Sequence, residues 1–122
     1  MNSSTLNSFG GLYSLTVKNF RKGRPLYKHL EKEVFLFYRV DSNTWDIYRN
    51  PYSKSSYAYA EDITGCPPET GWKTIEASNW VDSNSLRVIE YSKENYSRDQ
   101  NSVSRRFHVH YSAREQCSTS NQ

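Results

Sequence analysis

Short runs in which apolar and polar residues alternate recur along the whole chain. Successive side chains of a β-strand point to opposite faces, so this alternation predicts strands with one buried face. No stretch shows the apolar repeat of an amphipathic helix. The alternating runs span residues 12–17, 44–49, 86–91 and 106–111, and the apolar run 33–40 and the short pieces 25–29 and 57–60 are also predicted as strands. The sequence therefore predicts an all-β fold, a small antiparallel meander or barrel-like domain of about six to seven short strands.

Turn and loop residues separate these runs. Residues 33–40 form the most apolar run and are predicted as the central strand, which the turn residues 41–43 join to 44–49 in a β-hairpin. Prolines and glycines exclude regular structure from residues 65–71, and we expect that loop to place Trp72 at the rim of the domain. The polar stretch 92–104 is predicted to be a mobile connection.

The chain has 122 residues, the length of one domain. Hydrophobic residues make up only 35% of it, yet aromatic residues reach 15%, a share that a disordered chain would lack. We predict a single β-rich domain over residues 10–112, with flexible segments at 1–9 and 113–122. No run approaches the roughly 18 apolar residues that span a bilayer. Residues 1–8 lack the apolar core of a secretory signal, so we expect a soluble chain without a membrane span or signal peptide.

Basic residues cluster between positions 18 and 28, although the formal net charge is only +3. Phe20 and Tyr27 lie among them, and cations interleaved with aromatic rings suit single-stranded nucleic acid. Gly23 and Pro25 in the same segment indicate a solvated loop instead. The residues of a polyanion-binding site would be Lys18, Arg21, Lys22, Arg24, Lys28, Arg105 and Arg106.

The two cysteines, Cys66 and Cys117, match no metal-binding spacing. A disulfide between them would indicate an extracellular protein, whereas two free thiols fit the cytoplasm. The sequence leaves both compartments open.

His108 and His110 lie two residues apart on a predicted strand, so both imidazoles would project from one face. Such a pair supplies two metal ligands if a third group, such as His29, Glu90 or Asp46, converges on it. It could also serve acid–base chemistry on a phosphate ester. The simpler interpretation is that both are exposed and alternate with a buried stripe. We predict no catalytic residue, no cofactor and no metal site, with these two histidines as the only metal candidates.

Tyrosine and tryptophan concentrate in the loop-rich stretch from residue 48 to residue 72. Loops carry binding functions more often than strands do, and rings with a polar group stack on sugars or anchor protein partners. Some of these rings must instead fill a core that has few aliphatic residues. We assign Trp45 to the core and leave Trp80 open. The predicted binding residues are Tyr48, Tyr52, Tyr57, Tyr59 and Trp72.

The first part of the chain shows a recurring spacing of glycine, proline and aromatic residues. Its motifs are Gly11-Leu12-Tyr13, Gly23-Arg24-Pro25-Leu26-Tyr27, Trp45-Asp46-Ile47 and Pro67-Pro68-Glu69-Thr70-Gly71-Trp72. With these motifs, residues 10–72 resemble a small β-rich module common in multidomain proteins of invertebrates and protists. The resemblance implies a structural or recognition module with no settled activity, so it transfers no catalytic residue. Residues 73–122 lie outside it.

These observations together favour a non-enzymatic recognition module that binds a protein or a glycan through an aromatic-lined surface. One alternative is a nucleic-acid-binding β domain that uses the basic segment 18–28. Another is a small enzyme or metal site built on His108 and His110. The sequence predicts no oligomeric state and does not name the ligand.

Overall fold

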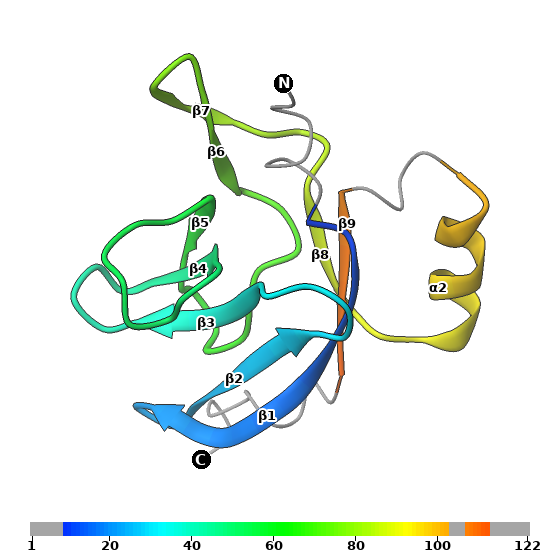
Figure 1. Ribbon diagram of the computed structural model, residues 1–122, viewed down its shortest axis with the longest axis horizontal. Coiled ribbons are helices and arrows are strands. Elements are labelled where there is room, and N and C mark those ends of the chain that lie inside the picture. Colours follow the sequence, from blue (N-terminus) through cyan, green and yellow to red (C-terminus); the bar gives the residue numbers. More distant parts are fainter. Residues whose placement is uncertain (1–8, 103–106, 113–122) are drawn as a thin grey trace.

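The computed structural model describes residues 9–102 and 107–112. Within them the chain forms one nine-stranded, strongly curled sheet that resembles half of a barrel, with one short helix beside it (Figure 1). In chain order the elements are β1 (Gly11–Arg21), β2 (Arg24–His29), β3 (Phe35–Arg39), β4 (Thr44–Tyr48), β5 (Ala58–Glu61), β6 (Lys73–Glu76), β7 (Asn79–Asp82), β8 (Arg87–Glu90), α2 (Lys93–Gln100) and β9 (His108–Tyr111).

The strand order across the sheet is β7-β6-β5-β4-β3-β2-β1-β9-β8. Strands β1 to β7 pair with their sequence neighbours in antiparallel fashion, as a meander does. The last two strands break that pattern, because β9 runs parallel to both β1 and β8. The prediction of a β-rich fold is confirmed, but the prediction of a purely antiparallel sheet is wrong.

The helix α2 replaces part of the connection that we predicted to be mobile. Parallel neighbours need a crossover connection, and α2 lies in the one that joins β8 to β9. Ser92 begins the helix, since its side chain accepts a hydrogen bond from the backbone N–H of Asn95. The helix has no apolar stripe, which is why the sequence pattern did not reveal it. The prediction of an all-β fold is wrong at this element.

Strands β6 and β7 form a hairpin that the sequence analysis also missed. Their turn residues, Ala77 and Ser78, both have positive φ values, 52° and 69°. Hairpin turns of this kind normally carry asparagine or glycine, so these residues gave no turn signal. The hairpin projects from the body of the sheet (Figure 1).

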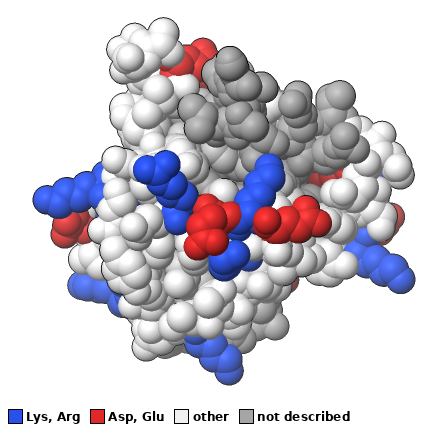
Figure 2. Space-filling model, viewed as in Figure 1, with Lys and Arg blue, Asp and Glu red and all other residues white. Residues whose placement is uncertain are grey.

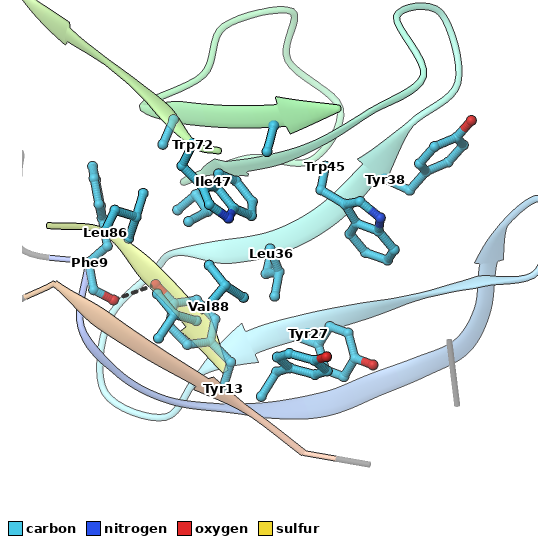
Figure 3. Packing of buried hydrophobic residues seen from close by; sticks show 14 of the residues in the cluster. Phe9, Tyr13, Tyr27, Leu36, Tyr38, Trp45, Ile47, Trp72, Leu86 and Val88 are labelled. Atoms are coloured by element: carbon cyan, nitrogen blue, oxygen red, sulfur yellow. Dashed lines mark hydrogen bonds between the residues drawn. The ribbon is translucent and has the colours of Figure 1, made fainter. Parts of the chain in front are cut away.

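Aromatic side chains dominate the core that the curled sheet encloses (Figure 3). Trp45, Tyr13 and Tyr27 are fully buried, and the Tyr13 hydroxyl donates a 2.7 Å hydrogen bond to the backbone oxygen of Phe9. The assignment of Trp45 to the core is confirmed. Trp72 is also fully buried and its indole N–H donates to the backbone oxygen of Pro68 at 2.8 Å, so its predicted position at the rim is wrong.

The predicted terminal segments fall almost entirely outside the described residues, in 1–8 and 113–122. Phe9, which we placed in the N-terminal segment, packs in the core at 3% exposure. The described part of the chain contains no helix with the length and apolar character needed to cross a bilayer.

Candidate ligand-binding site

A cavity of about 530 Å³ lies on the face of the sheet opposite the core, which we call the outer face. Trp45 and Ile47 of β4 point into the core, so Asp46 between them points to the outer face, where it pairs with Tyr59 of β5. The loop of residues 50–57 forms one wall of the cavity and the β6–β7 hairpin forms the other. The cavity is lined by Arg39, Ser42, Thr44, Asp46, Lys54, Ser55, Ser56, Tyr59, Ile75 and Trp80.

A buried carboxylate organises the polar side of this cavity. Asp46 is 3% exposed and accepts hydrogen bonds from Thr44 Oγ1 at 2.6 Å, from Arg39 Nε at 3.2 Å and from the Ser56 hydroxyl. Ser42 adds a 2.7 Å contact to the Thr44 hydroxyl. A buried carboxylate is stable only when it is paired and hydrogen-bonded, and Asp46 meets both conditions.

Arg39 links this carboxylate to the loop wall. Its Nη1 donates to the backbone oxygen of Ser53 at 2.7 Å, and its Nη2 donates to the backbone oxygen of Ser55 at 3.0 Å and to the Ser56 hydroxyl at 3.2 Å. The Arg39–Asp46 pair therefore holds the loop in place over the outer face. The groups of the pair bond to the protein itself, so they serve mainly to position the wall.

The opposite side of the cavity is apolar. The rings of Tyr59 and Trp80 meet edge to face, with centroids 4.8 Å apart and an interplanar angle of 72°. Trp80 is 41% exposed and Ile75, directly across from it in the hairpin, is 43% exposed. The cavity thus presents hydroxyl and charged groups on one side and aromatic and aliphatic groups on the other.

The five aromatic residues that we predicted as a binding surface do not come together. Tyr48 packs on Tyr57 with centroids 4.7 Å apart, and Tyr57 also packs against the core. Tyr52 is 76% exposed and contacts Phe20 outside the cavity. Trp72 is in the core. Only Tyr59 lines the cavity.

Sequence reasoning missed most of the residues that do form the site. It left Trp80 open, did not consider Ile75, and treated Asp46 only as a possible metal ligand. One signal was available, because Asp46 interrupts an apolar strand between Trp45 and Ile47. A charged residue at that position marks the strand face that turns away from the core.

The basic segment of residues 18–28 is largely engaged within the protein. Arg24 forms a 2.5 Å ion pair with Asp62, Arg21 donates to the backbone oxygens of Tyr38 and Pro51, and Lys28 contacts backbone oxygens and Glu33. Burial, followed by the nearby Arg39 charge, lowers the pKa of Arg21.

Lys18 and Lys22 remain exposed, while Arg105 and Arg106 lie outside the described residues. On the face shown in Figure 2, acidic and basic groups lie next to one another rather than forming a continuous basic patch.

His108 and His110 share one face of β9, and both contact the same carboxylate oxygen. Asp99 Oδ2 of α2 lies 2.8 Å from His108 Nδ1 and 2.7 Å from His110 Nε2. The interpretation of both histidines as exposed is wrong for His110, which is 1% exposed beneath the helix. None of the three residues that we named as third ligands, His29, Glu90 and Asp46, is hydrogen-bonded to this pair. In residues 9–102 and 107–112, no group of three or more His, Cys, Asp or Glu side chains is arranged to hold a metal ion.

The surroundings of these groups shift their pKa values. Burial lowers the pKa of His110, against the opposing effect of Asp99, and its Nδ1 atom has no hydrogen-bond partner among the described residues. Burial would raise the pKa of Asp99, but the hydrogen bonds from the two histidines outweigh it, so that pKa lies below its ordinary value. Both shifts favour a neutral His110 that donates to an ionised Asp99.

Cys66 is buried at 2% exposure and is disulfide-bonded. The other cysteine of the sequence, Cys117, lies outside the described residues.

Comparison with protein-family models, with curated proteins and with solved structures finds no match for this chain. The resemblance over residues 10–72 therefore stays a prediction, and the functional argument rests on the geometry of the cavity.

Proposed function

We propose that this protein is a non-enzymatic recognition module that binds a glycan in the outer-face cavity. The observation that carries the proposal is the division of the cavity into a polar side, built around Asp46 and Arg39, and an apolar side, built from Tyr59, Ile75 and Trp80. A sugar ring has the matching character, with hydroxyl groups at its edge and a C–H surface on its face.

The size and position of the cavity support the same conclusion. Ligand cavities usually measure about 300 to 1,000 Å³ and combine apolar walls with a few well-placed polar groups. At about 530 Å³ this cavity is large enough for a short oligosaccharide. The Trp80 ring is exposed where a sugar could stack on it, and the loop held by Arg39 supplies hydroxyl groups opposite.

A protein partner is the second ligand class that the aromatic residues suggested. Protein interfaces usually bury roughly 800 Å² on each partner, and the predicted aromatic residues are dispersed over separate places instead of forming one such surface. Nucleic acid is supported less, since Arg21, Arg24 and Lys28 already bond to the protein. A glycan, in contrast, matches both the polar side and the apolar side of the cavity.

The disulfide bond at Cys66 favours a location of this protein outside the reducing cytosol. Disulfides persist mainly in oxidising compartments, and the sequence analysis took a disulfide as the sign of an extracellular protein. We infer that the module meets its glycan outside the cell.

The test is binding of the full chain to a printed array of neutral and acidic glycans. Trp80→Ala and Tyr59→Ala should each weaken the array signals about two- to twelvefold, because an aromatic contact contributes about 0.5 to 1.5 kcal/mol. Tyr91→Ala is the matched control, since Tyr91 is 38% exposed and does not line the cavity. Circular dichroism should show that all three variants remain folded. An array without signal, or signals that Tyr91→Ala reduces as much as Trp80→Ala does, would refute the proposal.

A further inference from the structure

The charges that line the cavity do not cancel. Arg39 and Asp46 form a pair at 3.2 Å in which the two side chains are 16% and 5% exposed. Lys54 is the remaining charged group of the lining. It is exposed and forms no ion pair or hydrogen bond with the described residues. The lining therefore carries one surplus positive charge on its loop wall.

Two further carboxylates, Glu61 and Asp82, belong to the neighbouring strands β5 and β7 but are not part of the lining. Glu61 lies opposite Thr44 on the outer face, and Asp82 forms a 2.5 Å ion pair with Lys73. Both raise the pKa of Lys73, Asp82 more strongly through its hydrogen bond. Neither Glu61 nor Asp82 lines the cavity, so Lys54 has no acidic partner within the lining.

Two residues of the lining, Lys54 and Trp80, carry groups that can only donate hydrogen bonds. A lysine ammonium and an indole N–H can donate but cannot accept. The indole N–H groups of the two buried tryptophans already have acceptors, Asp62 for Trp45 and the Pro68 backbone oxygen for Trp72. Trp80 Nε1 and Lys54 Nζ have none among the described residues. A ligand that satisfies both must present acceptor oxygens.

We propose that the cavity selects sugars that carry a carboxylate. The carboxylate lies at Lys54, an oxygen of the sugar accepts from Trp80 Nε1, and the C–H face of the ring packs against Tyr59 and Trp80. An ionised carboxylate is acceptor-only and negatively charged, which matches the donor-only groups of Lys54 and Trp80 and the surplus charge of the lining. This inference rests on the proposed glycan-binding function and narrows it to one chemical class.

The test compares two probes that differ only in the acidic group, methyl β-D-glucuronide and methyl β-D-glucoside. The full chain, labelled with ¹⁵N, is titrated with each probe while the three tryptophan indole N–H signals are followed. We expect the Trp80 signal to shift and the Trp45 and Trp72 signals to stay, because only Trp80 faces the cavity. The glucuronide should bind about three- to tenfold more tightly than the glucoside, since hydrogen bonds to charged groups are stronger than neutral ones.

Two variants assign the preference to one side chain. Lys54→Gln should remove the preference for the glucuronide over the glucoside. Lys93→Gln, at an exposed lysine of α2 remote from the cavity, should leave the preference intact. Added sodium chloride should weaken binding of the glucuronide alone, because salt screens charge pairs near the surface.

The outcomes separate this inference from the function on which it rests. Equal binding of the two probes, or a preference that survives Lys54→Gln, would overturn the inference and leave glycan binding standing. A third titration uses glutamate, which carries a carboxylate without a sugar ring. Equal binding of glutamate and the glucuronide would show that the sugar ring contributes nothing, which would refute glycan recognition. A Trp80 signal that no probe shifts up to its solubility limit would overturn both.

Discussion

Replacing Asp46 by asparagine tests whether the buried ion pair holds the cavity together. The asparagine has nearly the same shape but no charge, so it leaves Arg39 without a counter-ion. Its amide oxygen can still accept from Arg39 Nε and the Ser56 hydroxyl, while its amide nitrogen donates to the Thr44 hydroxyl. The substitution therefore keeps the hydrogen bonds satisfiable and removes the charge that compensates Arg39.

The structure sets the size of this effect. Breaking a fully buried ion pair by removing one partner costs about 3 to 5 kcal/mol. The Arg39 side chain is 16% exposed and keeps its bonds to the backbone oxygens of Ser53 and Ser55, so the lower limit applies. We expect Asp46→Asn to reduce the free energy of unfolding by about 3 kcal/mol, a large part of the total stability of a small domain.

Urea unfolding followed by tryptophan fluorescence measures this loss. Asp82→Asn is the matched control, because it removes the same charge from the Lys73–Asp82 pair, whose side chains are 41% and 81% exposed. An exposed pair contributes little, so the control should unfold at the same urea concentration as the parent chain. Hydrogen exchange at residues 53–56 should accelerate in Asp46→Asn only. If both variants unfold at the same midpoint, the structural role assigned to the Arg39–Asp46 pair is wrong.

Three further predictions concern the rest of the fold. Burial lowers the pKa of His110 of β9 in the folded chain. When α2 undocks, His110 therefore takes up a proton below the ordinary histidine pKa of about 6.5, which the docked state resists. The contact of α2 with β9 through Asp99 is therefore complete above that pH and weakens as the pH falls. Hydrogen exchange of the helix amides, corrected for the intrinsic exchange rate, should accelerate when the pH is lowered from about 7 to about 5. Unchanged protection of these amides would contradict this prediction. Trp72→Ala should cost about 3 to 5 kcal/mol in chemical unfolding, since it empties a fully buried site, and a loss below 1 kcal/mol would return Trp72 to the rim. Gly11→Ala should lower the melting temperature, because φ at Gly11 is +137° and a Cβ there would collide with the His29 ring; a parent-like melting curve would exclude that contact.

The antiparallel part of the fold was accessible to sequence reasoning. Residues 33–40 form the most apolar run, residues 44–49 alternate, and turn residues separate the two. The structure pairs β3 with β4 as a hairpin. Local chemistry decides such a pairing, because the two strands are adjacent in the chain and register follows from the turn. Long-range pairings carry no such local signal. The parallel contacts of β9 with β1 and β8 join segments far apart in the chain, and the helix between β8 and β9 lacks the apolar stripe by which a helix is recognised.

For the candidate site too, the sequence determined some features and the tertiary structure decided the others. The sequence alone determined that the chain is rich in aromatic residues, that it forms short strands, and that many rings must serve a core with few aliphatic residues. It did not determine which rings are buried, because tyrosine and tryptophan suit a core and a surface equally well. Only the curl of the sheet placed Trp72 inside, left Trp80 exposed on a projecting hairpin, and brought Tyr59 and Lys54 to one cavity. The reason is geometric, since a strand pattern specifies two faces but not which distant segment covers each of them.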